Sequence, residues 1–165
     1  MAKESSFDVV STVDMQEVDN AFQQARKELS QRYDLKGSGA EISLDKAGKS
    51  ITVKAPSDFT ANQVIDVISS KLIRRKVDID SVKWGAAQSS AGQSVTRTGN
   101  IIEGIDRDTA GKINKDIRAL KLKAKVQIEG DRLRVSSASR DTLQEVIAFL
   151  KEQDYGQPLQ FVNYR

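Results

Sequence analysis

The pattern of apolar and polar residues repeats itself along the chain with an offset of 82 positions. Residues 51–68 align without a gap with residues 133–150, and most apolar positions of the first stretch meet apolar positions of the second. A serine, Ser57 or Ser139, stands at the same place before the helical part of each stretch. A repeat of about 80 residues is too long for a solenoid and indicates a duplicated small domain.

Both halves of the chain contain the same succession of predicted elements. In the first half the pattern predicts a strand at 7–13, a helix after Asp14, strands at 40–45 and 50–55, a helix after Ser57 and a strand at 77–84. In the second half it predicts a strand at 95–102, a helix after Asp106, strands at 123–129 and 132–137, a helix after Ser139 and a strand at 159–164. The strands are rich in β-branched residues, and each helix has an apolar stripe that follows a capping residue.

The order β-α-β-β-α-β in each half predicts an α+β fold of two tandem ferredoxin-like domains. Right-handed crossovers place both helices on one face of a four-stranded antiparallel sheet. The small, polar segment 85–93 is typical of a linker, so the domains are expected to span residues 1–89 and 90–165. The opposite face of each sheet either packs against the other sheet or presents a surface to a ligand, and the pattern leaves both alternatives open.

The absence of histidine and cysteine narrows the chemistry available to this chain. Without an imidazole base or a thiolate, triads that use these groups and zinc sites with His and Cys ligands are excluded. Carboxylate, lysine or serine chemistry stays open, but no spacing points to it, and we expect no enzyme activity, metal or cofactor. The lack of cysteine and of an apolar run long enough for a membrane span predicts a cytoplasmic protein.

The net charge of +3 is unevenly distributed along the sequence. Residues 1–89 contain 13 basic and 13 acidic side chains, whereas residues 90–165 contain 13 basic and 10 acidic ones. A basic cluster at 71–76 ends a predicted helix, where cations complement the helix dipole. In a second cluster, Lys112 and Lys115 lie on a helix face opposite the apolar stripe. Such a face is either a solvated surface or a series of phosphate contacts.

Two glycine-containing segments have some features of phosphate-binding loops. Gly48-Lys49-Ser50 lacks the required upstream glycine and leads into a strand, so a hairpin turn is the better interpretation. Gly37-Ser38-Gly39 does not fit a dinucleotide fingerprint, but its backbone could form an anion-binding nest helped by Arg32 and Lys36. The central strands contain no aromatic residue, so a standard RNA-recognition surface is not expected.

Several segments resemble the bacterial YajQ family and together extend over the whole chain. They are residues 6–11 (SFDVVS), 32–37 (RYDLKG), 103–110 (EGIDRDTA), 129–135 (EGDRLRV), 139–144 (SRDTLQ) and 157–165 (QPLQFVNYR). The resemblance implies a cytoplasmic protein of two ferredoxin-like domains, and it raises the alternative that strands 7–13 and 95–102 are exchanged between the domains. It also implies nucleotide binding, association with RNA or tRNA and, for some members, a role as an effector of cyclic di-GMP that acts through partner proteins.

Residues and resemblance together lead us to expect a non-enzymatic protein that binds a nucleotide, including cyclic di-GMP, or RNA. The phosphates would be held by Arg and Lys side chains. The candidate binding residues are the cations Arg32, Lys36, Lys112, Lys115, Arg134 and Arg140. The alternative is a protein-interaction adaptor that docks a transcription or chaperone partner through an exposed apolar patch.

Overall fold

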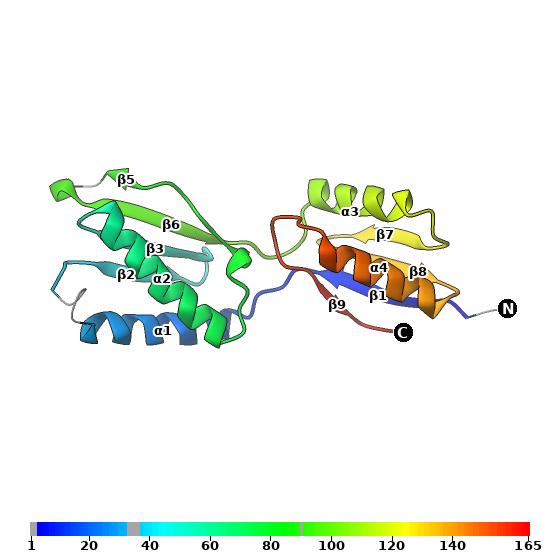
Figure 1. The fold of residues 1–165 in the computed structure, drawn as a ribbon, viewed down its shortest axis with the longest axis horizontal. Helices are drawn as coiled ribbons and strands as arrows, with labels where there is room; N and C mark the ends of the chain where they lie inside the picture. Colours follow the sequence, from blue (N-terminus) through cyan, green and yellow to red (C-terminus); the bar gives the residue numbers. More distant parts are fainter. Residues whose placement is uncertain (1–2, 33–36, 90) are drawn as a thin grey trace. The chain divides into compact units, whose positions relative to one another are not determined.

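The computed structural model describes residues 3–32, 37–89 and 91–165. These residues form two compact units (Figure 1). One unit contains the N-terminal segment up to Thr12 together with Glu103–Arg165, and the other contains Val13–Ile102. The chain therefore passes from one unit to the other twice, after Thr12 and after Ile102.

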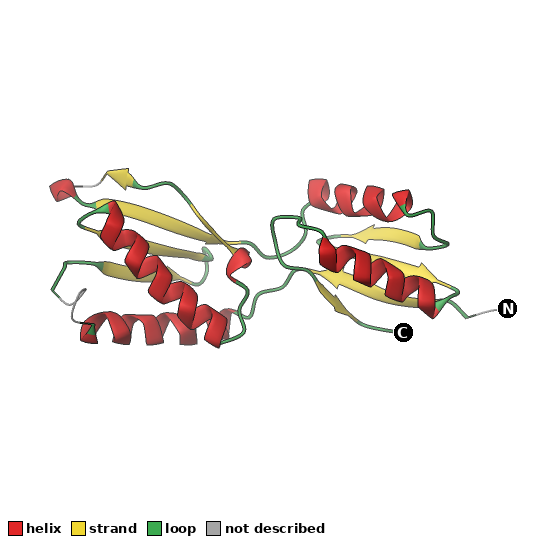
Figure 2. Cartoon of the chain, in the orientation of Figure 1, coloured by secondary structure: helices red, strands yellow, loops and turns green. Residues whose placement is uncertain are grey.

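The unit Val13–Ile102 is a sheet with two helices packed on one face (Figure 2). Its elements are α1 (Met15–Gln31), β2 (Glu41–Asp45), β3 (Ser50–Ala55), α2 (Asp58–Arg74), a 3-10 turn (Ile79–Ser81), β4 (Val82–Trp84), β5 (Gln88–Ser89), a second 3-10 turn (Ala91–Gln93) and β6 (Val95–Ile101). The strand order is β2-β3-β6-β4, all pairs are antiparallel, and β5 also pairs with β6.

The other unit has the same plan. Its elements are β1 (Ser5–Val10), α3 (Arg107–Ala119), β7 (Lys125–Glu129), β8 (Arg132–Ser137), α4 (Arg140–Glu152) and β9 (Gln160–Val162). They form an antiparallel sheet of order β7-β8-β1-β9, with α3 and α4 packed on one face. The predicted fold class, α+β with two ferredoxin-like arrangements of two helices and an antiparallel sheet, is confirmed.

A central strand of each sheet comes from the other half of the sequence. β1 lies between β8 and β9, with Phe7 opposite Val135 and Val9 opposite Leu133. Likewise, β6 lies between β3 and β4. Side chains alternate across a strand, so Phe7 and Val9 face the helices while Asp8 points to the other face of the sheet. Both apolar side chains are fully buried, which fixes this register because a shift by one residue would expose them.

The helices begin at the residues that the sequence predicts as caps. The side chain of Asp14 accepts hydrogen bonds from the backbone N–H groups of Gln16 and Glu17, and the side chain of Ser57 accepts one from Thr60. Behind these caps each helix presents its apolar stripe to the sheet. Each unit consequently has a hydrophobic core of its own.

Several predicted segments differ in detail from the structure, among them the strand expected at 159–164, which is reduced to β9. The strand expected at 77–84 is reduced to β4, because Asp78 caps a 3-10 turn by accepting from the N–H of Asp80. The strand expected at 7–13 ends at Val10. The segment 85–93, which has the composition of a linker, contains β5. Because β5 pairs with β6 of the same unit, this segment connects two strands within one unit.

Gly99 on β6 is expected to resist substitution because two side chains occupy the space of a β-carbon. A Cβ at this position would lie 2.8 Å from Cγ1 of Val82 and 2.9 Å from Cε3 of Trp84. Gly99→Ala should lower the free energy of unfolding by about 1–3 kcal/mol and shift the emission of Trp84, the only tryptophan. Gly111→Ala on α3 is the control and should be neutral or stabilising, because an added Cβ would meet no atom within 4 Å apart from its chain neighbours and the backbone of its own helix. Equal effects in urea unfolding would contradict this account.

Candidate functional site

A cavity of about 300 Å³ lies where both ends of the chain approach the first turn of α4. It is lined by Ser5, Ser6, Arg140, Leu143, Gln144, Tyr164 and Arg165, and we call it the Tyr164 pocket. Ser6 and Arg165 exchange two backbone hydrogen bonds, of 3.2 and 3.0 Å, which hold the C-terminal residues beside β1. The pocket is thus assembled from β1, α4 and the segment after β9.

The residues that line the Tyr164 pocket include one aromatic residue, Tyr164, and two arginines, Arg140 and Arg165. The ring of Tyr164 is 61% exposed and lies 6.3 Å from the ring of buried Phe7, so one side of it is supported by the core. Arg140 and Arg165 are exposed. None of the described lining residues has an acidic side chain. An exposed ring can stack on a base, and a guanidinium can hold a phosphate through two parallel hydrogen bonds.

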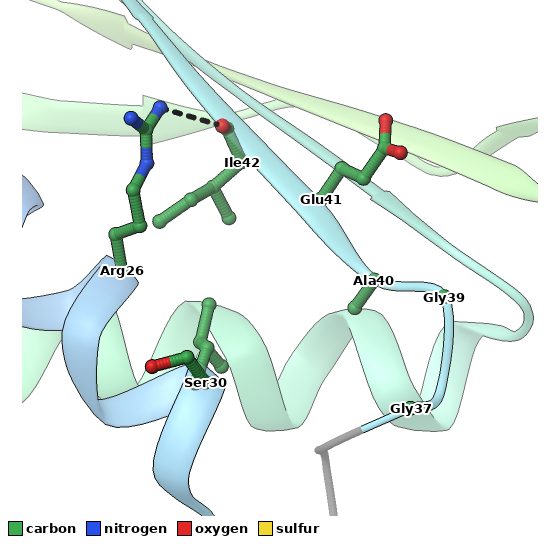
Figure 3. Close-up of a pocket in the computed structure, with 8 residues that line it drawn as sticks. Arg26, Ser30, Gly37, Gly39, Ala40, Glu41 and Ile42 are labelled. Carbon is green, nitrogen blue, oxygen red and sulfur yellow. Dashed lines mark hydrogen bonds between the residues drawn. The ribbon is translucent and has the colours of Figure 1, made fainter.

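A second cavity, of about 670 Å³, lies between α1 and β2 in the other unit (Figure 3). It is lined by Arg26, Leu29, Ser30, Gly37, Gly39, Ala40, Glu41 and Ile42. The guanidinium of Arg26 lies 5.0 Å from the centre of the Phe22 ring and donates a 3.5 Å hydrogen bond to the carbonyl of Ile42. Figure 3 shows Arg26 and Glu41 on opposite sides of the opening. Among the described residues, its lining contains one cation, Arg26, which is already hydrogen-bonded, and one carboxylate, Glu41.

The structure places the six predicted cations in different surroundings. Arg32 caps the end of α1 with its Nη1 3.9 Å from Oε2 of Glu28, and Lys36 lies outside the described residues. Lys112 and Lys115 are exposed on α3. Arg140 lines the Tyr164 pocket.

Arg134 lies on the sheet face opposite the helices and is engaged by carboxylates. Its Nε donates a hydrogen bond of 3.1 Å to Oδ1 of Asp8, and its Nη1 lies 3.7 Å from Oε1 of Glu129. The hydrogen bond to Asp8 and the charge of Glu129 raise the pKa of Arg134 from its ordinary value. A phosphate at this position would compete with both carboxylates.

The pocket residues Tyr164 and Arg165 were missed by the sequence reasoning, which searched for clusters of cations. The signal available for them was the C-terminal segment QPLQFVNYR, which carried the family resemblance but no chemical motif. Neither residue is close in sequence to Arg140. Only the pairing of Ser6 with Arg165 and the position of α4 bring them together.

Two further properties of the described residues bear on the kind of protein. Among them, no three acidic side chains are grouped so that they could hold a metal ion. No helix in these parts of the chain combines the length and the apolar character needed to span a membrane.

Fold and pocket together define an α+β protein of two ferredoxin-like units with a cationic, aromatic-lined pocket. The chain belongs to the YajQ-like family of nucleotide-binding proteins, because the model of that family matches residues 5–165. Nucleotide-binding proteins of Desulfitobacterium hafniense (strain Y51) and Bacillus cytotoxicus are each 45% identical to it over 165 residues, which is the full length of both chains in each pair. A nucleotide-binding protein of Chloroherpeton thalassium is 42% identical over the same length. The names of these relatives describe binding rather than a reaction.

Proposed function

We propose that this chain binds a nucleotide in the Tyr164 pocket without transforming it. The observation that carries the proposal is the meeting of an exposed ring, Tyr164, with Arg140 and Arg165 around one cavity. Relatives named as nucleotide-binding proteins match the chain over its full length, which supports a nucleotide as the ligand. The proposed setting is the cytoplasm, in keeping with a chain that contains no cysteine.

Each part of a nucleotide has a counterpart in the pocket. The base stacks on the ring of Tyr164, the arginines hold the phosphate, and the side chains of Ser5 and Gln144 supply hydrogen bonds to sugar or base. A volume of about 300 Å³ is at the lower end for ligand pockets, which suits a single nucleotide. The ligand is a mononucleotide or one nucleotide of RNA or of cyclic di-GMP.

The cavity between α1 and β2 is the weaker site for this ligand. It is larger, but Glu41 repels a phosphate and Arg26 already donates to a carbonyl. Its lining contains no aromatic side chain among the described residues. The anion nest expected at Gly37-Ser38-Gly39 borders this cavity and stays a prediction.

The adaptor alternative receives less support from the distribution of exposed apolar side chains. Phe59 and Ile73, which are 73% and 59% exposed, both lie on α2. They are 14 residues apart, or about 21 Å along a helix, so they do not form one patch. A docking surface would need a contiguous apolar area.

Replacing the pocket side chains should weaken nucleotide binding. Tyr164→Ala and Arg140→Ala are each expected to weaken it about tenfold or more, because base stacking contributes about 1–3 kcal/mol and a charge-assisted hydrogen bond about 1.5–3 kcal/mol. Titration calorimetry with GMP, GTP, cyclic di-GMP and a short RNA gives the affinities and identifies the preferred ligand.

The matched controls are Phe59→Ala, an exposed ring on α2, and Arg107→Ala, an exposed arginine on α3. Both should bind like the unmodified protein. Absence of saturable heat for every ligand up to about 100 μM would sink the proposal, since this is the weak limit of affinity expected for a dedicated site. Equal affinities of pocket and control variants would place the site elsewhere.

A further inference from the structure

A hollow of about 430 Å³ lies between α1 and α2, and the described residues that line it all have polar side chains. The lining residues are Gln24, Lys27, Glu28, Gln31, Lys71, Arg74 and Arg75, and we call the hollow the α1–α2 groove. Four of the seven are cations and one is a carboxylate. Pockets for organic ligands are lined mainly by apolar and aromatic groups, so this lining suits a small, highly charged ligand.

Helix geometry explains why these side chains converge. Gln24, Lys27, Glu28 and Gln31 are spaced by three, four and seven residues along α1 and share one face. Lys71, Arg74 and Arg75 have the same spacing at the end of α2. The two helices pack against each other, so both polar faces border the same hollow.

Two of the four cations are paired with carboxylates. Nζ of Lys71 lies 2.8 Å from Oε1 of Glu28, and Lys71 is only 8% exposed. The hydrogen bond from Lys71 lowers the pKa of Glu28 against the opposing effect of burial. Nη1 of Arg75 lies 3.7 Å from Oε2 of Glu17. These pairs join the helices and leave little positive charge unbalanced on Lys71 and Arg75.

The other two cations, Lys27 and Arg74, are exposed and border the groove, and the charge of Arg74 also acts on Glu28. In the described parts of the chain, neither has a carboxylate oxygen within 4.0 Å. Arg74 is the last residue of α2, where a positive charge is stabilised by the helix dipole. The helix dipole does not explain Lys27 in the same way, because this residue lies before the last turn of α1. The amides of Gln24 and Gln31 add hydrogen-bond donors at the same place.

We propose that the α1–α2 groove is an anion site for a small oligophosphate, of which pyrophosphate is the simplest case. Lys27 and Arg74 supply the positive charge, and Gln24 and Gln31 donate hydrogen bonds to the phosphate oxygens. None of the described residues that line the groove has an aromatic ring that could stack on a base. The site belongs to the unit Val13–Ile102, whereas the Tyr164 pocket belongs to the other unit, and neither proposal requires the other.

The test is a calorimetric titration of the full chain with inorganic pyrophosphate at physiological ionic strength. One saturable site below about 1 mM is expected. Lys27→Gln combined with Arg74→Gln should weaken binding about tenfold or more, since charge-assisted contacts to phosphate are lost. Arg107→Gln combined with Lys151→Gln removes the same amount of charge from exposed positions of the other unit and should change the affinity less than about twofold.

Amide chemical shifts locate the bound anion. Pyrophosphate should shift the amide signals of residues 24–31 and 71–76 in the unmodified protein. The spectra of the two double variants should also show that both are folded. Absence of saturable binding, equal loss in both double variants, or perturbation centred on residues 140–144 would overturn the proposal. Arg140→Ala should leave pyrophosphate binding intact even if it abolishes nucleotide binding, so the two proposals fail separately.

Discussion

Phe7→Ala is expected to destabilise the unit that contains Glu103–Arg165 by about 3–5 kcal/mol, the range for truncating a buried aromatic side chain. Phe7 is fully buried and belongs to the core cluster of α3, α4 and β8. Its ring also contacts Phe161 edge to face, with 5.9 Å between the ring centres. The truncation therefore removes core volume and an aromatic contact from residues almost the whole chain length away.

Hydrogen exchange followed by mass spectrometry shows which unit responds. With β1 paired to β8 and β9, exchange in Phe7→Ala should accelerate in residues 105–162 and change little in 14–84. Phe22→Ala, which truncates a ring 2% exposed in the core of the other unit, is the matched control and should give the opposite pattern. Acceleration in residues 14–84 of Phe7→Ala would instead support domains with the boundaries 1–89 and 90–165.

Local features of this fold could be predicted from the sequence because they depend on neighbouring residues. All four predicted caps, Asp14, Ser57, Asp106 and Ser139, accept backbone hydrogen bonds from the first turn of their helices. Of the apolar stripe predicted for the first helix, Val18, Ala21, Phe22 and Ala25 are buried, and Leu29 is half-buried. A capping side chain and a helical stripe are each specified within a few turns of chain.

Strand partners could not be predicted from residue pattern alone. Phe7 and Val9 would alternate in the same way beside any partner strand, and β1 pairs with residues more than 120 positions away. This pairing also changes the charge of each part. Counted by structural unit, the unit with Glu103–Arg165 has 13 basic and 12 acidic side chains and the other has 13 and 11, so the excess in the second half of the sequence is not an excess of one unit.

Of the residues that line the Tyr164 pocket, only Arg140 was predicted from the sequence as a binding residue. Its cationic side chain can be recognised in the sequence, but the pocket also needs Tyr164 and Arg165. These two residues lie near Arg140 because the C-terminal residues pair with β1. Arg134 was predicted in the same way, but its charge is matched by Asp8. Whether a cation is free or paired depends on contacts between strands that are distant in sequence.

Asp8→Asn is expected to lower the free energy of unfolding by about 1–3 kcal/mol near neutral pH. The substitution removes a buried negative charge, and the arginine side chains that interact with it lose their ionic partner. Asp8 is 1% exposed on the sheet face without helices. Its Oδ2 accepts a 2.8 Å hydrogen bond from Asn163 and lies 3.7 Å from Nη1 of Arg132, while Arg134 donates to Oδ1. The carboxylate thus ties β8 and the residues after β9 to β1.

The loss of stability caused by Asp8→Asn should become smaller as the pH falls, because of the environment of the Asp8 carboxylate. Burial alone would raise the pKa of Asp8, but the hydrogen bonds from Asn163 and Arg134 and the charges of both arginines outweigh it and lower the pKa below the ordinary value of 3.8. A lowered pKa means that the charged form stabilises the folded state. This contribution is complete above about pH 5 and is lost as the pH falls through the folded-state pKa.

Urea unfolding of both proteins across this range measures the contribution as a difference. The gap between the unmodified protein and Asp8→Asn should be constant from about pH 5 to 8 and should close in acid. Other carboxylates with lowered pKa values, such as Asp19 and Asp106, are present in both proteins and cancel. Asp66→Asn, at an exposed position of α2, should change the free energy by less than about 0.5 kcal/mol. If the difference in unfolding free energy stayed constant down to pH 2, the effect of Asp8→Asn would not come from the lost charge. The charge of Asp8 would then have no part in holding β1 in the sheet.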